Sequence, residues 1–190
     1  FCNMEPPKPS VSSYGSHYRG YRGGAVSSSP PTPLTMEVFS QSSGPCFTGD
    51  CEVLLSNNGV KLIEDVCQGD YVKTPSGTAI VVCVTKTYCK NNETILVNMK
   101  NGLRVTPYHP IRYNNEWQFP AKLIEDGNSS VEMSNQQCDI VYNFVLNKDH
   151  VIIINGYECC TLGHGFRDNS VIQHDYYGCL LYTSPSPRDV

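Results

Sequence analysis

The feature that most constrains the fold is a series of short apolar runs between Cys46 and Phe166, separated by turn sequences. The runs are rich in Val, Ile, Thr and Tyr, as β-strands are. They span residues 51–55, 70–74, 79–87, 94–99, 140–147 and 150–155. Asn and Gly, which tolerate the positive φ angles of tight turns, recur between them. No long helical periodicity is present, although residues 61–66 could form one helical turn. The pattern therefore predicts an all-β fold.

Residues 1–45 lack this pattern, because Pro, Ser and Gly dominate them. Such a segment buries too little apolar surface to offset the entropy of ordering it. We therefore expect a disordered, flexible linker at 1–45 with another domain upstream, a domain at 46–166, and an irregular tail at 167–179. Residues 180–190 resemble translated sequencing-adapter sequence rather than native protein, and they are excluded from the fold argument.

Charge and composition narrow the range of partners and cofactors. The formal net charge is -4 and the basic residues are scattered, which argues against binding to nucleic acid. The sequence lacks an apolar run of about eighteen residues, so no membrane span is predicted. The ten cysteines include no CxxC pair, so no metal is expected, and nothing indicates a cofactor. Most cysteines fall in apolar runs, where they act as small hydrophobes, and we favour a reduced, cytoplasmic compartment.

Cys46 lies where the linker meets the domain, in the sequence GPCFTGDC. A thiol at this position can attack the carbonyl of Pro45, which converts the peptide bond to a thioester and releases the nitrogen of Cys46 as an amine. The exchange requires a polarised amide and a proton for the leaving nitrogen. The alternative is that Cys46 is simply the first buried residue of a strand.

Two segments carry histidines that could supply the proton. In TPYHP (106–110), His109 can titrate near neutral pH and the Thr106 hydroxyl can hold the same amide. The alternative here is a loop histidine flanked by prolines. The stretch 141–155 is predicted to form a hairpin, with His150 at the start of its second strand. His150 is a second acid–base candidate, and its alternative is a structural role.

Taken together, these stretches resemble the hedgehog/intein (Hint) superfamily of autoprocessing domains. Five motifs occur in the superfamily's order: CFxGD at 46–50, IEDVxxGDYV at 63–72, TxxH at 106–109, VYNFVL at 141–146, and a His to Asn-Gly segment at 150–156. The GPCFTGDC beginning and the TLGHG ending are most similar to the Vint branch, which occurs beside von Willebrand A domains.

The resemblance implies a horseshoe of short twisted strands with pseudo-twofold halves. It implies that Cys46 is the nucleophile, that His109 is the proton donor to the leaving nitrogen, and that Thr106 assists at the scissile amide. His150 matches the histidine before the family's final strand and is a further candidate. The implied partners are an upstream domain of the same chain, of von Willebrand A type, and water or an external nucleophile that accepts the acyl group.

Departures from the superfamily pattern narrow the expected reaction. No His-Asn pair follows Asn155-Gly156, so complete protein splicing is not expected. Asn143 stands where many inteins carry an Asp, and the ring of Pro45 crowds the carbonyl that must be attacked. Two further cysteines, Cys159 and Cys160, are candidates for a second nucleophile that resolves the thioester.

Two other functions remain open from the sequence. A Hint scaffold that no longer cleaves could serve as an interaction module beside a von Willebrand A domain, and Pro45 and Asn143 favour this interpretation. A cysteine protease acting in trans could use the same Cys46 and His109, although no motif of a substrate cleft accompanies them.

Overall fold

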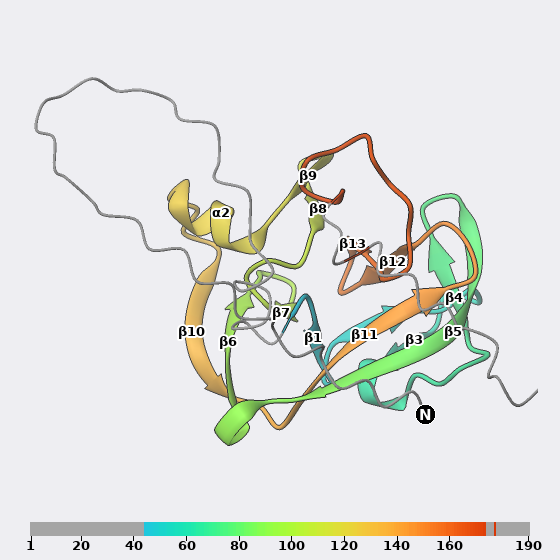
Figure 1. The fold of residues 1–190 in the computed structure, drawn as a ribbon, viewed down its shortest axis with the longest axis horizontal. Helices are drawn as coiled ribbons and strands as arrows, with labels where there is room; N and C mark the ends of the chain where they lie inside the picture. Colours follow the sequence, from blue (N-terminus) through green and yellow to red (C-terminus); the bar gives the residue numbers. More distant parts are fainter. Residues whose placement is uncertain (1–43, 174–176, 178–190) are drawn as a thin grey trace, which may run out of the picture.

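The computed structural model describes residues 44–173 and 177, and most of them form β-strands and turns (Figure 1). Within these residues, the fold consists of two antiparallel sheets and one short helix, α2 (Pro120–Glu125). The prediction of an all-β fold is therefore confirmed. The expectations for residues 1–43 and 178–190 lie outside the described residues.

Seven strands form the first sheet, in the spatial order β10-β6-β7-β1-β11-β5-β4. Their bounds are β1 (Phe47–Thr48), β4 (Tyr71–Thr74), β5 (Gly77–Tyr88), β6 (Glu93–Asn98), β7 (Arg104–Val105), β10 (Glu132–Gln137) and β11 (Ile140–Leu146). The long strands β5 and β11 pair antiparallel along one another and cross most of the molecule in Figure 1.

Six strands form the second sheet, in the order β3-β2-β12-β13-β8-β9. Their bounds are β2 (Glu52–Leu54), β3 (Val60–Leu62), β8 (Ile111–Tyr113), β9 (Glu116–Gln118), β12 (Val151–Ile154) and β13 (Tyr157–Cys160). Two 3-10 turns complete the described elements, η1 (Ile63–Asp65) and η2 (Lys90–Asn92). The first of them is the helical turn expected within 61–66.

The expected turn residues adopt the backbone conformation that made them candidates. Asn58, Asn91 and Asn155 have φ angles of 64°, 58° and 47°, in the left-handed region that Asn tolerates better than most residues. Gly156 completes the last of these turns with a φ of 81°. The chain can therefore reverse tightly between short strands.

The predicted hairpin over 141–155 is wrong, because β11 and β12 belong to different sheets. The chain leaves the first sheet after Leu146, and Asp149 and His150 have positive φ angles of 64° and 49° where it changes direction. The next strand, β12, pairs with β2 and β13 instead. Its apolar residues Ile152 and Ile154 are fully buried in the common core, and this burial stabilises β12 in the second sheet.

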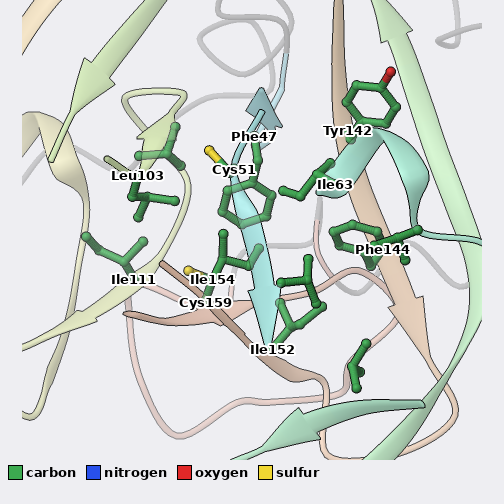
Figure 2. Packing of buried hydrophobic residues seen from close by; sticks show 14 of the residues in the cluster. Phe47, Cys51, Ile63, Leu103, Ile111, Tyr142, Phe144, Ile152, Ile154 and Cys159 are labelled. Carbon is green, nitrogen blue, oxygen red and sulfur yellow. The ribbon is translucent and has the colours of Figure 1, made fainter. Parts of the chain in front are cut away.

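The core is filled by apolar side chains from both sheets (Figure 2). Phe47, Phe144 and Ile152 are among its largest fully buried side chains. Cys51 and Cys159 lie in the same cluster and are also fully buried, as expected for cysteines that act as small hydrophobes.

The two-residue strand β1 connects two parts of the first sheet. Phe47 lies opposite Val105 of β7 on one side and opposite Tyr142 of β11 on the other, antiparallel in both cases. Continuing the register by one residue places Cys46 level with Thr106 and Asn143. The strand pairing therefore positions the candidate nucleophile between two polar side chains.

Packing continues beyond Phe166. Tyr177 is fully buried against Leu162, and its hydroxyl donates a 2.7 Å hydrogen bond to the carbonyl of Tyr108. The Tyr177 carbonyl accepts a 2.8 Å hydrogen bond from the amide of Gly163. No helix in the described part of the chain has the length and apolarity that crossing a membrane requires.

Candidate active site

The amide nitrogen of the Pro45–Cys46 peptide bond is held by Thr106. Cys46 N–H donates a 2.9 Å hydrogen bond to Thr106 Oγ1, and Thr106 N–H donates a 2.9 Å hydrogen bond to the Cys46 carbonyl. Thr106 is fully buried and Cys46 is 3% exposed. The pair continues the β1–β7 ladder by one residue, so the strand register determines the contact.

The carbonyl oxygen of the same peptide bond is held by Asn143. Its Nδ2 donates a 2.5 Å hydrogen bond to the Pro45 carbonyl, and its Oδ1 accepts a 2.7 Å hydrogen bond from the amide of Phe144. The second contact leaves the amide group oriented with its donor toward Pro45. Asn143 is buried in the middle of β11, so the donor acts where little water competes.

His109 approaches the peptide bond from the turn that begins at Thr106. Its amide donates a 3.2 Å hydrogen bond to the Thr106 carbonyl, which closes the turn, and its ring packs on Phe47 with 4.0 Å between ring centroids. Nε2 lies 2.8 Å from the Cys160 carbonyl. Because a carbonyl only accepts, Nε2 carries the proton and Nδ1 of the neutral ring has a free lone pair. Nδ1 is buried and has no hydrogen-bond partner among the described residues.

Burial keeps the His109 ring neutral. It lowers the pKa of His109 from its ordinary 6.5 to about 3, although the carbonyls of Cys160 and Pro45 favour the protonated ring and oppose part of the decrease. The Pro45 carbonyl thus contributes to the electrostatic environment of the ring. At neutral pH, His109 therefore presents an unprotonated nitrogen near the Pro45–Cys46 bond.

The thiol of Cys46 is likewise in its neutral form. Burial raises the pKa of Cys46 to about 12, with a hydrogen bond from Thr87 acting in the opposite direction. The neighbouring sulfurs of Cys89 and Cys138 add to the increase. A thiol attack at this position therefore requires removal of the sulfur proton during the reaction.

Comparison with known proteins gives the family. The Vint profile, described as a Hint-domain, matches residues 45–183 of the chain. This chain belongs to the Vint family of Hint domains. The Hint/intein fold is an autoprocessing fold, so the general class of activity follows from the family. A search of curated proteins finds no match for this Vint domain.

A search of solved structures finds inteins that are similar to this chain at low sequence identity. A DnaB intein from Synechocystis sp. is 12% identical with a TM-score of 0.49, covering 62% of this chain and 99% of its own. The gp41-1 intein is 13% identical with a TM-score of 0.47, covering 62% and 99%. A bacterial intein-like domain from Clostridium thermocellum is 17% identical with a TM-score of 0.47, covering 61% and 97%.

The structure of the Vint domain places His150 in a different environment from His109. Its ring packs edge-on to Phe166, and burial lowers its pKa while the Leu162 carbonyl opposes the decrease. His164 stacks on the same Phe166 ring. Among the described residues, the hydrogen bonds to the Pro45–Cys46 bond come from Thr106 and Asn143, and its Pro45 carbonyl acts on the pKa of His109 and not on that of His150 or His164.

The two candidate second nucleophiles are deeply buried. Cys159 lies in the main core, and Cys160 contributes its carbonyl to His109 while its sulfur lies 3.6 Å from the Thr161 carbonyl. Burial raises the pKa of both thiols well above the ordinary value. Neither sulfur has a contact with the Pro45–Cys46 bond among the hydrogen bonds of the described residues.

Asn143 is the site residue whose contribution the sequence argument did not anticipate. The superfamily resemblance indicates only that Asn143 stands where many inteins carry an Asp. The signal was its position, a lone amide inside the apolar run VYNFVL, since a buried polar side chain requires a hydrogen-bond partner. Within the described ranges, no three His, Cys, Asp or Glu side chains gather where they could hold a metal ion.

Proposed function

We propose that this Vint domain cleaves itself by converting the Pro45–Cys46 peptide bond to a thioester through an N-to-S acyl shift. The upstream segment is then released or transferred. The observation that supports the proposal is that the Pro45–Cys46 peptide group is hydrogen-bonded at both its oxygen and its nitrogen. Asn143 donates to its oxygen, Thr106 accepts from its nitrogen, and the Pro45 carbonyl acts on the buried ring of His109.

Asn143 supplies the electrophilic assistance that the acyl shift needs. As the sulfur attacks, negative charge develops on the Pro45 oxygen, and Asn143 Nδ2 already points at that atom. A preorganised donor in a buried site stabilises such charge without having to reorganise during the reaction. The contact is therefore expected to strengthen in the transition state.

His109 moves the proton from sulfur to nitrogen. Its Nδ1 accepts the thiol proton as Cys46 Sγ attacks the Pro45 carbonyl carbon, and it then donates this proton to the Cys46 nitrogen as the C–N bond breaks. One S–H and one C–N bond are lost, and one C–S and one N–H bond are formed. The low pKa of His109 makes the protonated ring short-lived, so proton transfer accompanies the heavy-atom steps.

Thr106 positions the leaving nitrogen for this transfer. Its Oγ1 holds the Cys46 N–H, and its carbonyl closes the turn that presents the His109 ring. The nitrogen and the ring are consequently fixed by the same four-residue turn. Small displacements of either group are costly when a reaction depends on near-attack geometry.

The partners of the reaction are an upstream domain of von Willebrand A type and an acyl acceptor. Hydrolysis of the thioester would release the upstream domain as an acid, whereas attack by an amine would leave it conjugated. The second candidate function is a scaffold that does not cleave. The protonated thiol of Cys46 and the crowding by Pro45 favour it. Burial of Cys46 argues against a protease acting in trans.

Mass spectrometry of the full chain carrying an N-terminal tag tests the proposal. We expect hydroxylamine or dithiothreitol to break the Pro45–Cys46 bond, and Cys46→Ala to remain intact. Cys67→Ala is the matched control, because Cys67 is exposed and its sulfur contacts the Asp65 carbonyl. Pro45→Gly, which removes the crowding ring, should cleave faster than the parent. If the parent and Pro45→Gly both stay intact under both reagents, the scaffold function replaces self-cleavage.

A further inference from the structure

The Cys46 side chain packs beside two other cysteines, and the acyl shift does not use their thiols. Cys46, Cys89 and Val141 form a small buried cluster, and Cys138 packs against it. Two backbone hydrogen bonds join the segments that carry Cys89 and Cys138. Cys89 N–H donates to Asp139 O at 2.9 Å, and Cys138 N–H donates to Asn92 O at 2.9 Å. The ends of β5 and β11 therefore bring two more thiols to the neighbourhood of the nucleophile.

The two neighbouring thiols differ in their access to solvent. Cys89 is buried, whereas Cys138 is half-buried and lines a solvent-open cavity of about 340 Å³. Thr48 and Tyr142 also line this cavity, and Cys46 does not. Cys138 therefore contacts the buried thiol cluster on one side and an open cavity on the other.

A thioester formed on Cys46 has no direct route to an acceptor. The Cys46 side chain is 3% exposed, so water, an amine or an external thiol would have to displace the packing around it. Cys159 and Cys160 do not solve this problem, because both are fully buried. The acyl group needs a carrier that reaches solvent.

We propose that Cys138 is a second acyl carrier, which takes the upstream segment from Cys46 and presents it in the adjoining cavity. This inference rests on the proposed function, since it requires a thioester on Cys46. The cavity is where water, an amine or a small thiol completes the reaction.

The transfer is a thiol–thioester exchange and is balanced without a cofactor. Cys138 Sγ gives up its proton and attacks the Pro45 carbonyl carbon, a C–S bond to Cys138 forms, the C–S bond to Cys46 breaks, and Cys46 Sγ takes the proton. One thioester replaces another, so the step is close to thermoneutral. The acceptor then attacks the same carbon, and Cys138 leaves as a thiol.

Cys138→Ala in the tagged full chain tests the carrier, with Cys67→Ala as the matched control. Under native conditions, hydroxylamine should release the upstream segment roughly tenfold or more slowly from Cys138→Ala, because an intramolecular thiol acts at a high effective concentration. After denaturation in mild acid, which preserves thioesters, hydroxylamine should release equal amounts from both variants. Cys138→Ser, which retains a donor for the Ile140 carbonyl that Cys138 Sγ contacts at 3.3 Å, carries the test if the alanine variant does not fold.

Peptide mapping of the acid-quenched parent gives a second readout. We expect a branched peptide in which Pro45 is joined to Cys138, and only the Cys46-linked species in Cys138→Ala. Equal native release rates without a branched Cys138 peptide would overturn the carrier and leave the acyl shift intact. A parent without any hydroxylamine-labile bond after denaturation would overturn both, so the two failures are distinguishable.

Discussion

The amide of Cys46 and the hydroxyl of Thr106, 60 residues apart in sequence, form a buried 2.9 Å hydrogen bond. Thr106→Val keeps the shape of the side chain and removes the acceptor. We expect slower cleavage at Pro45–Cys46 and a loss of about 1–3 kcal/mol in unfolding free energy, because a buried N–H is left unpaired. Urea denaturation and intact-mass time courses measure the two effects. Thr94→Val, a buried threonine on β6, is the control that should leave the cleavage rate unchanged.

Asn143→Leu should lower the cleavage rate by about 10²–10³-fold, the range found when one oxyanion donor is removed from an active site. The folded chain should persist, since leucine suits a buried strand position. Asn143→Asp is the informative companion. A carboxylate cannot donate to the Pro45 oxygen, whereas a protonated carboxyl can, so the rate of this variant should increase as the pH falls. A rate that is independent of pH in Asn143→Asp and unchanged in Asn143→Leu would exclude the oxyanion role.

Acid should destabilise the protein through His109. Its pKa is about 3 when folded and 6.5 ordinarily, so between these values the unfolded chain binds a proton that the folded chain does not. The contribution of His109 to the free energy of unfolding is therefore greatest above pH 6.5, and it decreases as the pH falls toward 3. His109→Gln should therefore lose less stability than the parent between neutral and acidic pH. Denaturant midpoints at several pH values measure the difference, and Thr106→Val, which removes no titrating group, should follow the parent's slope.

External thiols of opposite charge should resolve the thioester at different rates. The cavity beside Cys138 is lined by Asp50, Glu64 and Asp139, with Arg104 as its one cationic wall residue among those described. We expect cationic cysteamine to cleave faster than anionic mercaptoethanesulfonate at low salt, and the difference to shrink as salt screens the charges. Glu64→Gln should reduce the preference. Equal rates at low salt would show that the acceptor enters elsewhere.

Much of the fold could be predicted because local chemistry and tertiary structure agree. The runs at 70–74, 79–87 and 94–99 became β4, β5 and β6, and Asn-rich turns separate several of the strands. Strand β10 was not predicted, because its sequence EMSNQQ is polar and lacks the composition of a strand. It forms through ladder pairing with β6 along its whole length, a tertiary contact that no local pattern encodes.

The candidate site was harder to predict than the fold. The sequence separation of Cys46 from Thr106 and His109 does not indicate that they are close in space, and only the family resemblance implies it. The structure supplies the reason, which is that β1 pairs with β7 and places residue 46 level with residue 106. The hydrogen bond from Asn143 to Pro45 depends on the register of β1 against β11, and sequence alone gives no access to that register.

The position of the two-residue strand β1 determines at which stage of synthesis and folding the chain could cleave itself. The groups that would activate the Pro45–Cys46 bond come from β7, its following turn and β11, and they surround that bond only after β1 has been inserted between its neighbours. A nascent or misassembled chain would keep its upstream segment attached. Release of that segment would thus report that β7 and β11, which are synthesised after β1, had paired with it, so cleavage would mark the assembly of this part of the sheet.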